Sequence, residues 1–284
     1  MALSLILSSS DVFITEGSGA PPSAFIGGEL GTARLNSSLS DPLTNGEDFC
    51  REYRVPTSVS QGAWGEYTVI DSVDGGIYTG PFSTSKAYSM RAWIRNDAES
   101  NNRQSSLIGL CMRTTSGSTG TDNNGNPAKI RPGGYTVQLS GRNQADTGDD
   151  QNNIHLFLGA NYGGDNAGGI QGEEDPGFPP IECSGNAGDY ATNIWHRVRF
   201  DIIPIGGSGD TLNVYTSSAG DVPSGQEVWE LVGTRFIASS DPVYYDPTTT
   251  TASMGWYAMH HANNLNNDLG SVYIDQLEIL VQDL

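Results

Sequence analysis

The sequence predicts an all-β protein in which two antiparallel sheets stack as a sandwich. Apolar and polar residues alternate over many short stretches, which is the pattern of half-buried strands. Glycine is frequent, at 36 of 284 residues, and charged residues make up only 17%, a mixture typical of many strands joined by polar turns. No stretch shows a sustained helical period. Roughly a dozen such strands without an internal repeat favour a sandwich over a propeller or solenoid.

The clearest pattern lies between Asn193 and Ser217. From Trp195 to Ile203 the residues alternate, with His196 expected on the core face beside the apolar residues. Pro204 lacks an N–H donor, and the glycines that follow it predict a reversal into a second strand. Residues 88–95 alternate in the same way. Both strands carry Arg and Trp on the face opposite the core, which predicts that they are neighbours in one sheet.

The rest of the chain is expected to form one domain over residues 27–284, preceded by a segment 1–26 with a linker composition at its end. This N-terminal segment could supply a first strand, but its polar, glycine-rich gap favours an arm that pairs with another subunit. Further strands are expected at Tyr53–Val55, Trp64–Ile70, Leu107–Arg113, Tyr135–Arg142, Ile154–Leu158, Val228–Ala238, Met254–His260 and Ser271–Val281. The strongly apolar closing strand is predicted to be central in its sheet.

Charge and cysteine content exclude several classes of protein. The net charge of −19 argues against binding to nucleic acid or an anionic membrane. No apolar stretch reaches membrane length, and the N-terminus lacks the basic region of a secretory signal, so synthesis in a cytoplasm is expected. Cys50, Cys111 and Cys183 have neither metal-site nor disulfide spacing and are predicted to be buried thiols.

Three stretches carry a resemblance to a known fold: YSMRAWIR, NIWHRVRFDI and GSVYIDQLEI. From about Tyr88 onward the chain resembles the concanavalin A-like lectin/glucanase jelly roll. The resemblance implies a two-sheet antiparallel jelly-roll β-sandwich with long loops, here with an N-terminal arm. The whole chain also looks like the virion structural proteins of tailed bacteriophages, among them capsid cement or decoration proteins and tail adhesins.

One loop invites a calcium hypothesis. Asp122, Asn124 and Asn126 have the first three ligand spacings of a helix-loop-helix calcium site, but Pro127 and Gly133 occupy the places of the required glycine and glutamate. An Asn-Gly turn explains the motif better. We therefore predict neither a metal site nor a cofactor.

The sequence offers no positive case for catalysis. The Glu-x-Asp-x-x-Glu strand carried by glucanases of the resembled fold is absent. Asp275 and Glu278 are three residues apart, which on a regular strand puts them on opposite faces. No nucleophile elbow occurs, and the glutamates between Asn161 and Asp189 lie in an irregular loop. The prediction is a protein that is not an enzyme and has no catalytic residues.

Two sets of residues are candidates for binding. The first has the aromatic and amide chemistry of a sugar site, against the alternative that its aromatic rings pack in the core: Tyr244, Tyr245, Trp256, Tyr257, His260, Asn263 and Asn264. The second is a candidate partner interface: Leu3, Leu5, Leu7, Val12, Phe13, Arg91, Trp93, Arg95, Arg197, Arg199 and Phe178. Its Arg and Trp residues would either dock an acidic partner subunit or be covered internally by a loop such as Asn143–Asn153.

These observations favour a non-enzymatic virion structural protein, made in the host cytoplasm, that acts as a capsid cement or decoration protein. The expected partners are the major capsid protein or other virion subunits and further copies of the chain, a trimer being possible. The alternative is a carbohydrate-binding adhesin of a phage tail or fibre, which would bind a surface glycan. A glycoside hydrolase comes third.

Overall fold

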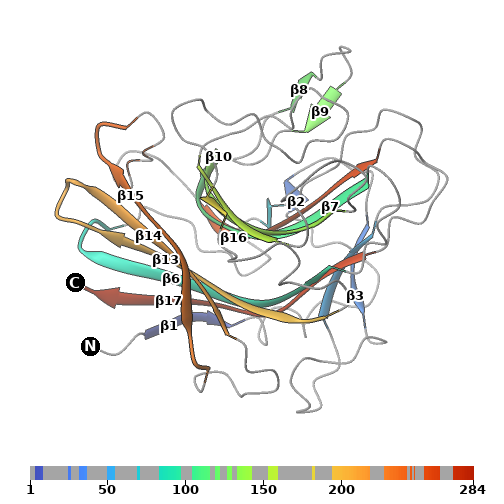
Figure 1. Ribbon diagram of the computed structural model, residues 1–284, viewed down its shortest axis with the longest axis horizontal. Coiled ribbons are helices and arrows are strands. Elements are labelled where there is room, and N and C mark those ends of the chain that lie inside the picture. The colour runs from blue at the N-terminus through green and yellow to red at the C-terminus, as the bar shows by residue number, and fades with distance from the viewer. Residues whose placement is uncertain are drawn as a thin grey trace.

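The computed structural model consists of antiparallel strands arranged in two stacked layers (Figure 1). It describes residues 4–8, 25–26, 32–36, 50–54, 69–70, 83–96, 104–115, 119–121, 127–129, 133–142, 153–158, 181–182, 194–217, 227–241, 244, 246, 253–262 and 271–284. Side chains are described for part of these, chiefly 83–96, 108–113, 194–217, 227–241 and 272–284. No helix capable of crossing a membrane occurs in this part of the chain.

The larger layer is an eight-stranded sheet. Seven of its strands follow one another in the order β15 (Glu230–Ala238), β14 (Gly209–Ser217), β13 (His196–Pro204), β6 (Lys86–Asn96), β17 (Ser271–Asp283), β4 (Cys50–Arg54) and β3 (Thr32–Asn36). The eighth, β1 (Ser4–Ser8), pairs with the second half of β17. The closing strand β17 therefore lies inside its sheet, as its apolar sequence predicts.

The smaller layer is a five-stranded sheet on the concave side of the larger one, and both layers curve in the same sense (Figure 1). Its order is β12 (Ile181–Glu182), β11 (Asn153–Leu158), β10 (Gly133–Arg142), β7 (Gln104–Thr115) and β16 (Ser253–Ala262). Two small ladders accompany the sheets, β2 (Phe25–Ile26) with β5 (Val69–Ile70) and β8 (Thr119–Thr121) with β9 (Pro127–Lys129).

The hydrophobic core fills the space between the two layers. Across the larger sheet one core rung runs through Val214, Phe200, Met90 and Ile279, all of them fully buried. The smaller sheet contributes its own buried row, which includes Leu110, Val137 and Leu156. Apolar residues recur at every second position, so each strand presents one face to this core. The predicted two-sheet antiparallel sandwich is confirmed.

The predicted hairpin after Pro204 is present. β13 and β14 pair from Arg197 with Ser217 to Pro204 with Asp210, and the turn between them contains Gly206 and Gly207 at positive φ. Gly209, at φ +145°, closes the turn so near to β15 that a Cβ would lie 2.0 Å from the carbonyl oxygen of Ile237. Only glycine fits there, because any side chain would collide with backbone.

The N-terminal segment differs from the prediction. Ser4–Ser8 forms β1, which pairs with β17 of the same chain, with Leu5 opposite Leu280 and Leu7 opposite Ile279. Of the two alternatives drawn from the sequence, the structure shows the first strand of the domain and not a separate arm, because one edge of β1 is already paired within the sheet. Leu3, Val12 and Phe13 lie outside the described residues.

The calcium motif is flanked by a short hairpin. Thr121 of β8 pairs with Pro127 of β9, whereas Asp122, Asn124 and Asn126 lie outside the described residues. Among the described residues, no group of three or more His, Cys, Asp or Glu side chains could hold a metal ion.

Candidate functional site

The outer face of the eight-stranded sheet contains an irregularity that sequence alternation could not reveal. In β17, Asp275 lies opposite Trp93 and Glu278 lies opposite Arg91. Between these two pairs β17 therefore contains one residue more than β6. This β-bulge includes Gln276, whose φ is +46°. An extra residue reverses the side-chain alternation. Asp275 and Glu278 therefore share the outer face, and the prediction that they lie on opposite faces is wrong.

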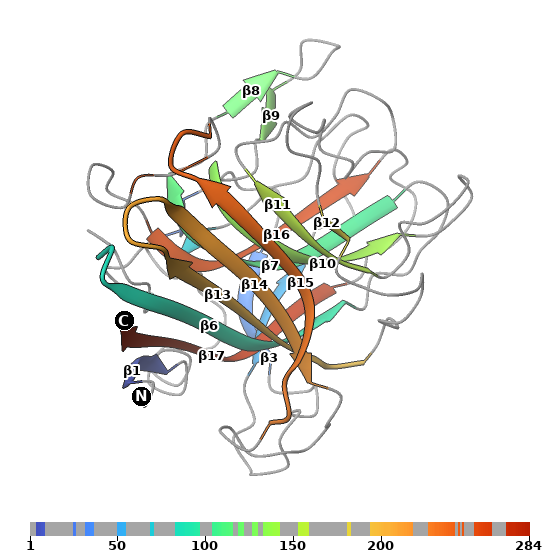
Figure 2. The same cartoon turned by 60° about the vertical axis from the view of Figure 1, so that its left-hand side comes forward.

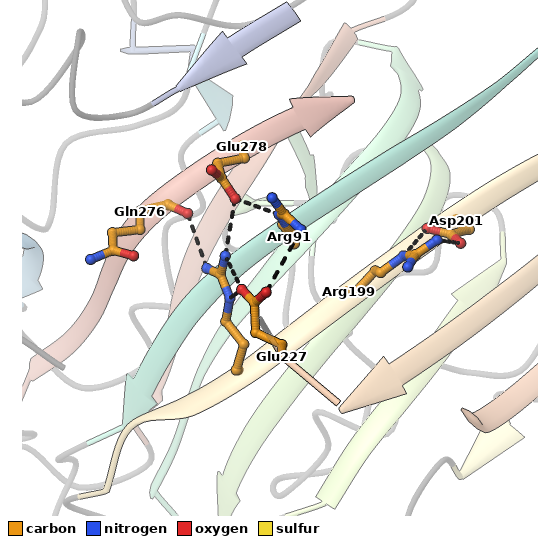
Figure 3. A network of polar contacts seen from close by, with 7 residues as sticks. Arg91, Arg199, Asp201, Glu227, Gln276 and Glu278 are labelled. Atoms are coloured by element: carbon orange, nitrogen blue, oxygen red, sulfur yellow. Dashed lines mark hydrogen bonds and ion pairs between the residues drawn. The ribbon is translucent and has the colours of Figure 1, made fainter. Parts of the chain in front are cut away.

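Glu278 is part of a buried network of two arginines and two glutamates (Figure 3). Arg197 donates from Nε to Glu227 at 3.1 Å, from Nη2 to Glu278 at 3.0 Å, and from Nη1 to the carbonyl of Gln276 at 3.1 Å. Arg91 binds Glu278 through Nε and lies 3.9 Å from Glu227 through Nη1. The formal charges cancel.

Burial is what makes this network unusual. The side chains of Arg197 and Glu227 are 0% and 1% exposed. Burial lowers the pKa of Arg197, while the carboxylates of Glu278 and Glu227 oppose that shift. Glu227 comes from the segment that precedes β15, so a stretch 30 residues further along the chain completes the cluster on β13.

Aromatic rings enclose the same cluster. The guanidinium of Arg197 lies 5.6 Å from the ring centroid of Trp93 and 6.0 Å from that of Trp229. Arg199 contacts Trp229 and Tyr215 in the same way and makes a two-pronged ion pair with Asp201, at 2.8 and 2.6 Å. These are cation–π distances.

The network corrects the predicted partner interface. Trp93 is 2% exposed and Arg197 is fully buried, so neither can dock a second protein. Arg91, Arg95 and Arg199 are half-buried. The internal alternative is the right one for this cluster, and the acidic cover described by the structure is Glu227 with Glu278. Residues 143–152 of the loop that was the expected cover, and Phe178, lie outside the described residues.

Substitution at the bulge tests its backbone geometry. We expect Gln276→Gly to raise the free energy of unfolding by about 1 kcal/mol, because a left-handed φ strains any residue with a Cβ. Arg197 would keep its bond to the carbonyl of residue 276, which is backbone. The control is Gln282→Gly, at a regular position of β17 opposite Ala87, where glycine should lower the free energy of unfolding by about 0.5–1 kcal/mol. Urea unfolding of the two variants and the wild type measures the effect. Equal losses in the two variants would contradict the prediction.

A second buried ion pair joins the two sheets. Arg113, at φ +51° in β7, binds Asp210 at the start of β14, and both side chains are at most 1% exposed. Burial raises the pKa of Asp210, against the opposing charge of Arg113. Burial also raises the pKa of the nearby Tyr244 phenol, with Asp210, Arg113 and Asp246 as its charged neighbours. Tyr244, one of the predicted ligand residues, thus belongs to this link at an end of the sandwich.

The other predicted ligand residues are not gathered on one face. On β16, Trp256 lies opposite Leu110 and so occupies a core-side position, and His260, four residues on, falls on the same side. Tyr257 lies opposite Gly109, on the outer side of the five-stranded sheet. Tyr245, Asn263 and Asn264 lie outside the described residues. The predicted ligand residues on β16 therefore lie on both faces of the five-stranded sheet.

The outer side of the five-stranded sheet carries a row that the sequence alone did not reveal. Successive cross-strand pairs join Glu182 to His155, His155 to Gln138, Gln138 to Gly109, and Gly109 to Tyr257. One rung thus crosses all five strands, from β12 to β16. The next rung on the core side is apolar throughout: Ile181, Leu156, Val137, Leu110 and Trp256.

The row combines groups that suit recognition of a hydroxyl-rich ligand. An aromatic residue, an amide, an imidazole and a carboxylate occupy neighbouring register positions on the outer side of the smaller sheet, which is the concave side in Figure 1, with a glycine on β7 between the amide and the aromatic residue. One rung further, the outer positions are held by Cys111 and Thr136, and both are fully buried. Cys111 is buried, as predicted.

Solved structures similar to the chain over almost its full length include lectin-like and enzymatic proteins. The carbohydrate recognition domain of Emp47p is 11% identical, with 98% of this chain and 96% of that one covered and a TM-score of 0.47. An endo-1,3-beta-glucanase from Streptomyces sioyaensis is 10% identical, with 99% of this chain and 97% of that one covered and a TM-score of 0.47. A carbohydrate esterase from the Shiga toxin-encoding bacteriophage phi24B is 12% identical, with 99% of this chain and 100% of that one covered and a TM-score of 0.45. No protein-family model matches the chain, and no curated protein is similar to it in sequence.

The two stacked antiparallel sheets have the architecture of the jelly-roll sandwich that the sequence resemblance implies. The resemblance drawn from the sequence is confirmed at the level of architecture. The prediction that the chain is not an enzyme is corrected, because a glucanase and a carbohydrate esterase are among the similar structures. What those proteins bind or cleave is their own property. The fold serves both kinds of protein, so it does not decide between them.

Proposed function

We propose that the protein binds a glycan on the concave face of its five-stranded sheet. The observation that carries this proposal is the row of Glu182, His155, Gln138, Gly109 and Tyr257, which aligns aromatic and hydrogen-bonding residues on one rung. Pyranose rings offer apolar C–H faces and many hydroxyl groups, so a binding surface needs both kinds of residue.

The opposite face of the molecule supports the choice by elimination within the described residues. There the Arg and Trp side chains that could bind a charged or aromatic ligand already contact one another, and the arginines are paired with Glu227 and Glu278. On the concave face, β7 places a glycine between Gln138 and Tyr257.

Glycan cleavage is a second candidate, favoured by the chemistry of the same row. Imidazole, phenol and carboxyl groups are the side chains that most often transfer protons in enzymes, and His155, Tyr257 and Glu182 supply one of each. His155 lies directly opposite Glu182 across the two strands. A carboxylate beside an imidazole can orient it and stabilise its protonated form.

Binding is tested with the full chain on a panel of neutral and acidic polysaccharides, followed by calorimetric titration of the best ligand. We expect Tyr257→Ala to weaken binding by about tenfold or more, equivalent to about 1.4 kcal/mol, because aromatic contacts dominate such sites. The matched control is Tyr215→Ala, which removes a half-buried tyrosine from the outer face of the other sheet. Equal weakening by both variants, or no binding to any polysaccharide by the wild type, would overturn the proposal.

Cleavage is read from the same mixtures. New reducing ends without an unsaturated product would indicate hydrolysis, whereas ultraviolet absorbance of an unsaturated product would indicate elimination. Loss of either signal in His155→Gln, with binding retained, would assign His155 to proton transfer. Binding without any product would leave the protein a glycan-binding module.

A structural role in a virion, which the sequence alone favours, stays a prediction. Part of the partner interface predicted for that role, the pair Trp93 and Arg197, is buried. Stoichiometric binding to empty capsids and a higher capsid melting temperature would establish it.

A further inference from the structure

One edge of the eight-stranded sheet carries an unusual concentration of exposed apolar side chains. Leu231 and Phe236 of β15 are 52% and 50% exposed, and Val228, just before the strand, is 77% exposed. Among the described strands β15 pairs only with β14 and so ends the sheet. In Figures 1 and 2 it forms the border of the β13–β14–β15 layer. A nine-residue edge strand offers a row of backbone groups to another strand.

A bulge in β15 gives this edge a symmetric pattern. Tyr215 pairs with Leu231 and Val214 with Gly233, so Val232 is an extra residue. The extra residue brings Leu231, Thr234 and Phe236 to the outer face, which they share with Tyr215, Asn213 and Thr211. Glu230 and Arg235 are opposite Thr216 and Leu212 and share the core-side face. We call the set Glu230, Leu231, Thr234, Arg235 and Phe236 the edge patch.

The edge patch is complementary to itself when a second copy runs antiparallel to it. With a two-fold axis between Val232 and Gly233, Glu230 of each copy lies opposite Arg235 of the other, and Leu231 lies opposite Thr234. Both pairs join residues of the same face, and in this register they do so because Val232 is an extra residue. Phe236 of one copy then becomes the diagonal neighbour of Leu231 in the other, within reach of an aromatic side chain.

We propose that β15 is the interface of a two-fold dimer, in which two eight-stranded sheets join edge to edge through the edge patch. The occupant is a second copy of this chain, because the charges are complementary only in the self-paired register: Glu230 meets Arg235 twice. The proposal concerns other residues than the glycan row and does not depend on it. Salt screens both the repulsion between two copies of net charge −19 and the attraction of the Glu230–Arg235 pairs, so association is measured at low and at high salt.

The first test measures the mass of the full chain by sedimentation over a dilution series at low and high salt. We expect a concentration-dependent shift between 30.2 kDa and twice that mass. Leu231→Lys should remain at the monomer mass, since a charge would face Thr234 and Phe236 of the other copy. The control is Ile194→Lys, at an apolar residue that is 51% exposed but outside β15, and it should dimerise like the wild type. Unchanged thermal unfolding would show that both variants are folded.

The second test exploits the charge pairs. Glu230→Arg and Arg235→Glu should each be monomeric alone, because like charges would then meet at both ends of the interface. Mixed in equal amounts they should form a heterodimer, since both pairs are opposite in sign again, and the double variant should dimerise by itself. A monomeric wild type at high concentration and high salt, undiminished dimerisation of Leu231→Lys, or no assembly of the mixture would each overturn the proposal.

Discussion

Replacing Arg197 with methionine is expected to lower the free energy of unfolding by about 3–5 kcal/mol. The guanidinium is fully buried and binds Glu227, Glu278 and the carbonyl of Gln276. Methionine would fill much of the space but leave two nearly buried carboxylates with only Arg91 to compensate them. Removal of one partner from a buried network costs more than the network contributes, because the remaining charges stay out of water.

The matched control is Arg199→Met on the same strand. Arg199 also makes an ion pair and cation–π contacts, but its side chain is 21% exposed and its partner Asp201 lies two residues away. Its loss should cost about 0.2–1 kcal/mol and shrink as salt is added. Urea unfolding at two salt concentrations measures both variants. Similar, salt-sensitive losses would show that burial does not set the strength of the Arg197 network.

The second large effect is expected at the link between the sheets. Arg113→Met should destabilise the fold by about 3–5 kcal/mol at neutral pH, because it leaves the carboxylate of Asp210 buried without its counter-charge. The loss should shrink as the pH falls. Burial raises the pKa of Asp210 even in the wild type, where Arg113 opposes the shift, so removing Arg113 must raise that pKa further.

The sign of this pH dependence follows from linkage. A carboxyl whose folded pKa exceeds its unfolded value of 3.8 favours folding when protonated, and stability falls as the pH rises from that value to the folded pKa. In the variant this window extends to higher pH and the fall is larger. Thermal unfolding from near pH 4 to pH 7 measures it. Arg113→Met combined with Asp210→Leu removes both charges and should recover most of the loss without the pH dependence; a parallel pH profile for the single and double variants would contradict the prediction.

Sequence alternation predicted the long strands well because each has one face in the core. The structure places Tyr88–Arg95 within β6 and Ser271–Val281 within β17, and β13 overlaps Trp195–Ile203. β6 and β13 are neighbours, as their shared Arg and Trp pattern predicts. Two- and three-residue strands such as Phe25–Ile26 and Thr119–Thr121 were missed, because alternation needs several residues to be visible.

The sites were harder to predict because they depend on register and on bulges. One extra residue near Gln276 moves every later side chain of β17 to the opposite face of the sheet from the one that regular alternation predicts. No residue type in that stretch indicates a bulge. His155 and Gln138 were passed over since each is an ordinary polar position in its own strand. They become a row only when strands far apart in sequence pair, and pairing partners cannot be read from alternation alone.

The position of β17 has a consequence for biosynthesis. This strand lies between β6 on one side and β1 and β4 on the other, yet it is translated after all of them. While the ribosome is still making the chain, β1 and the β3–β4 pair are not joined to the rest of the sheet, and β6 exposes an open edge. The large layer can be completed only after residue 283 has left the exit tunnel, so folding must wait for synthesis, and the nascent chain passes through a period in which chaperones would protect unpaired strands.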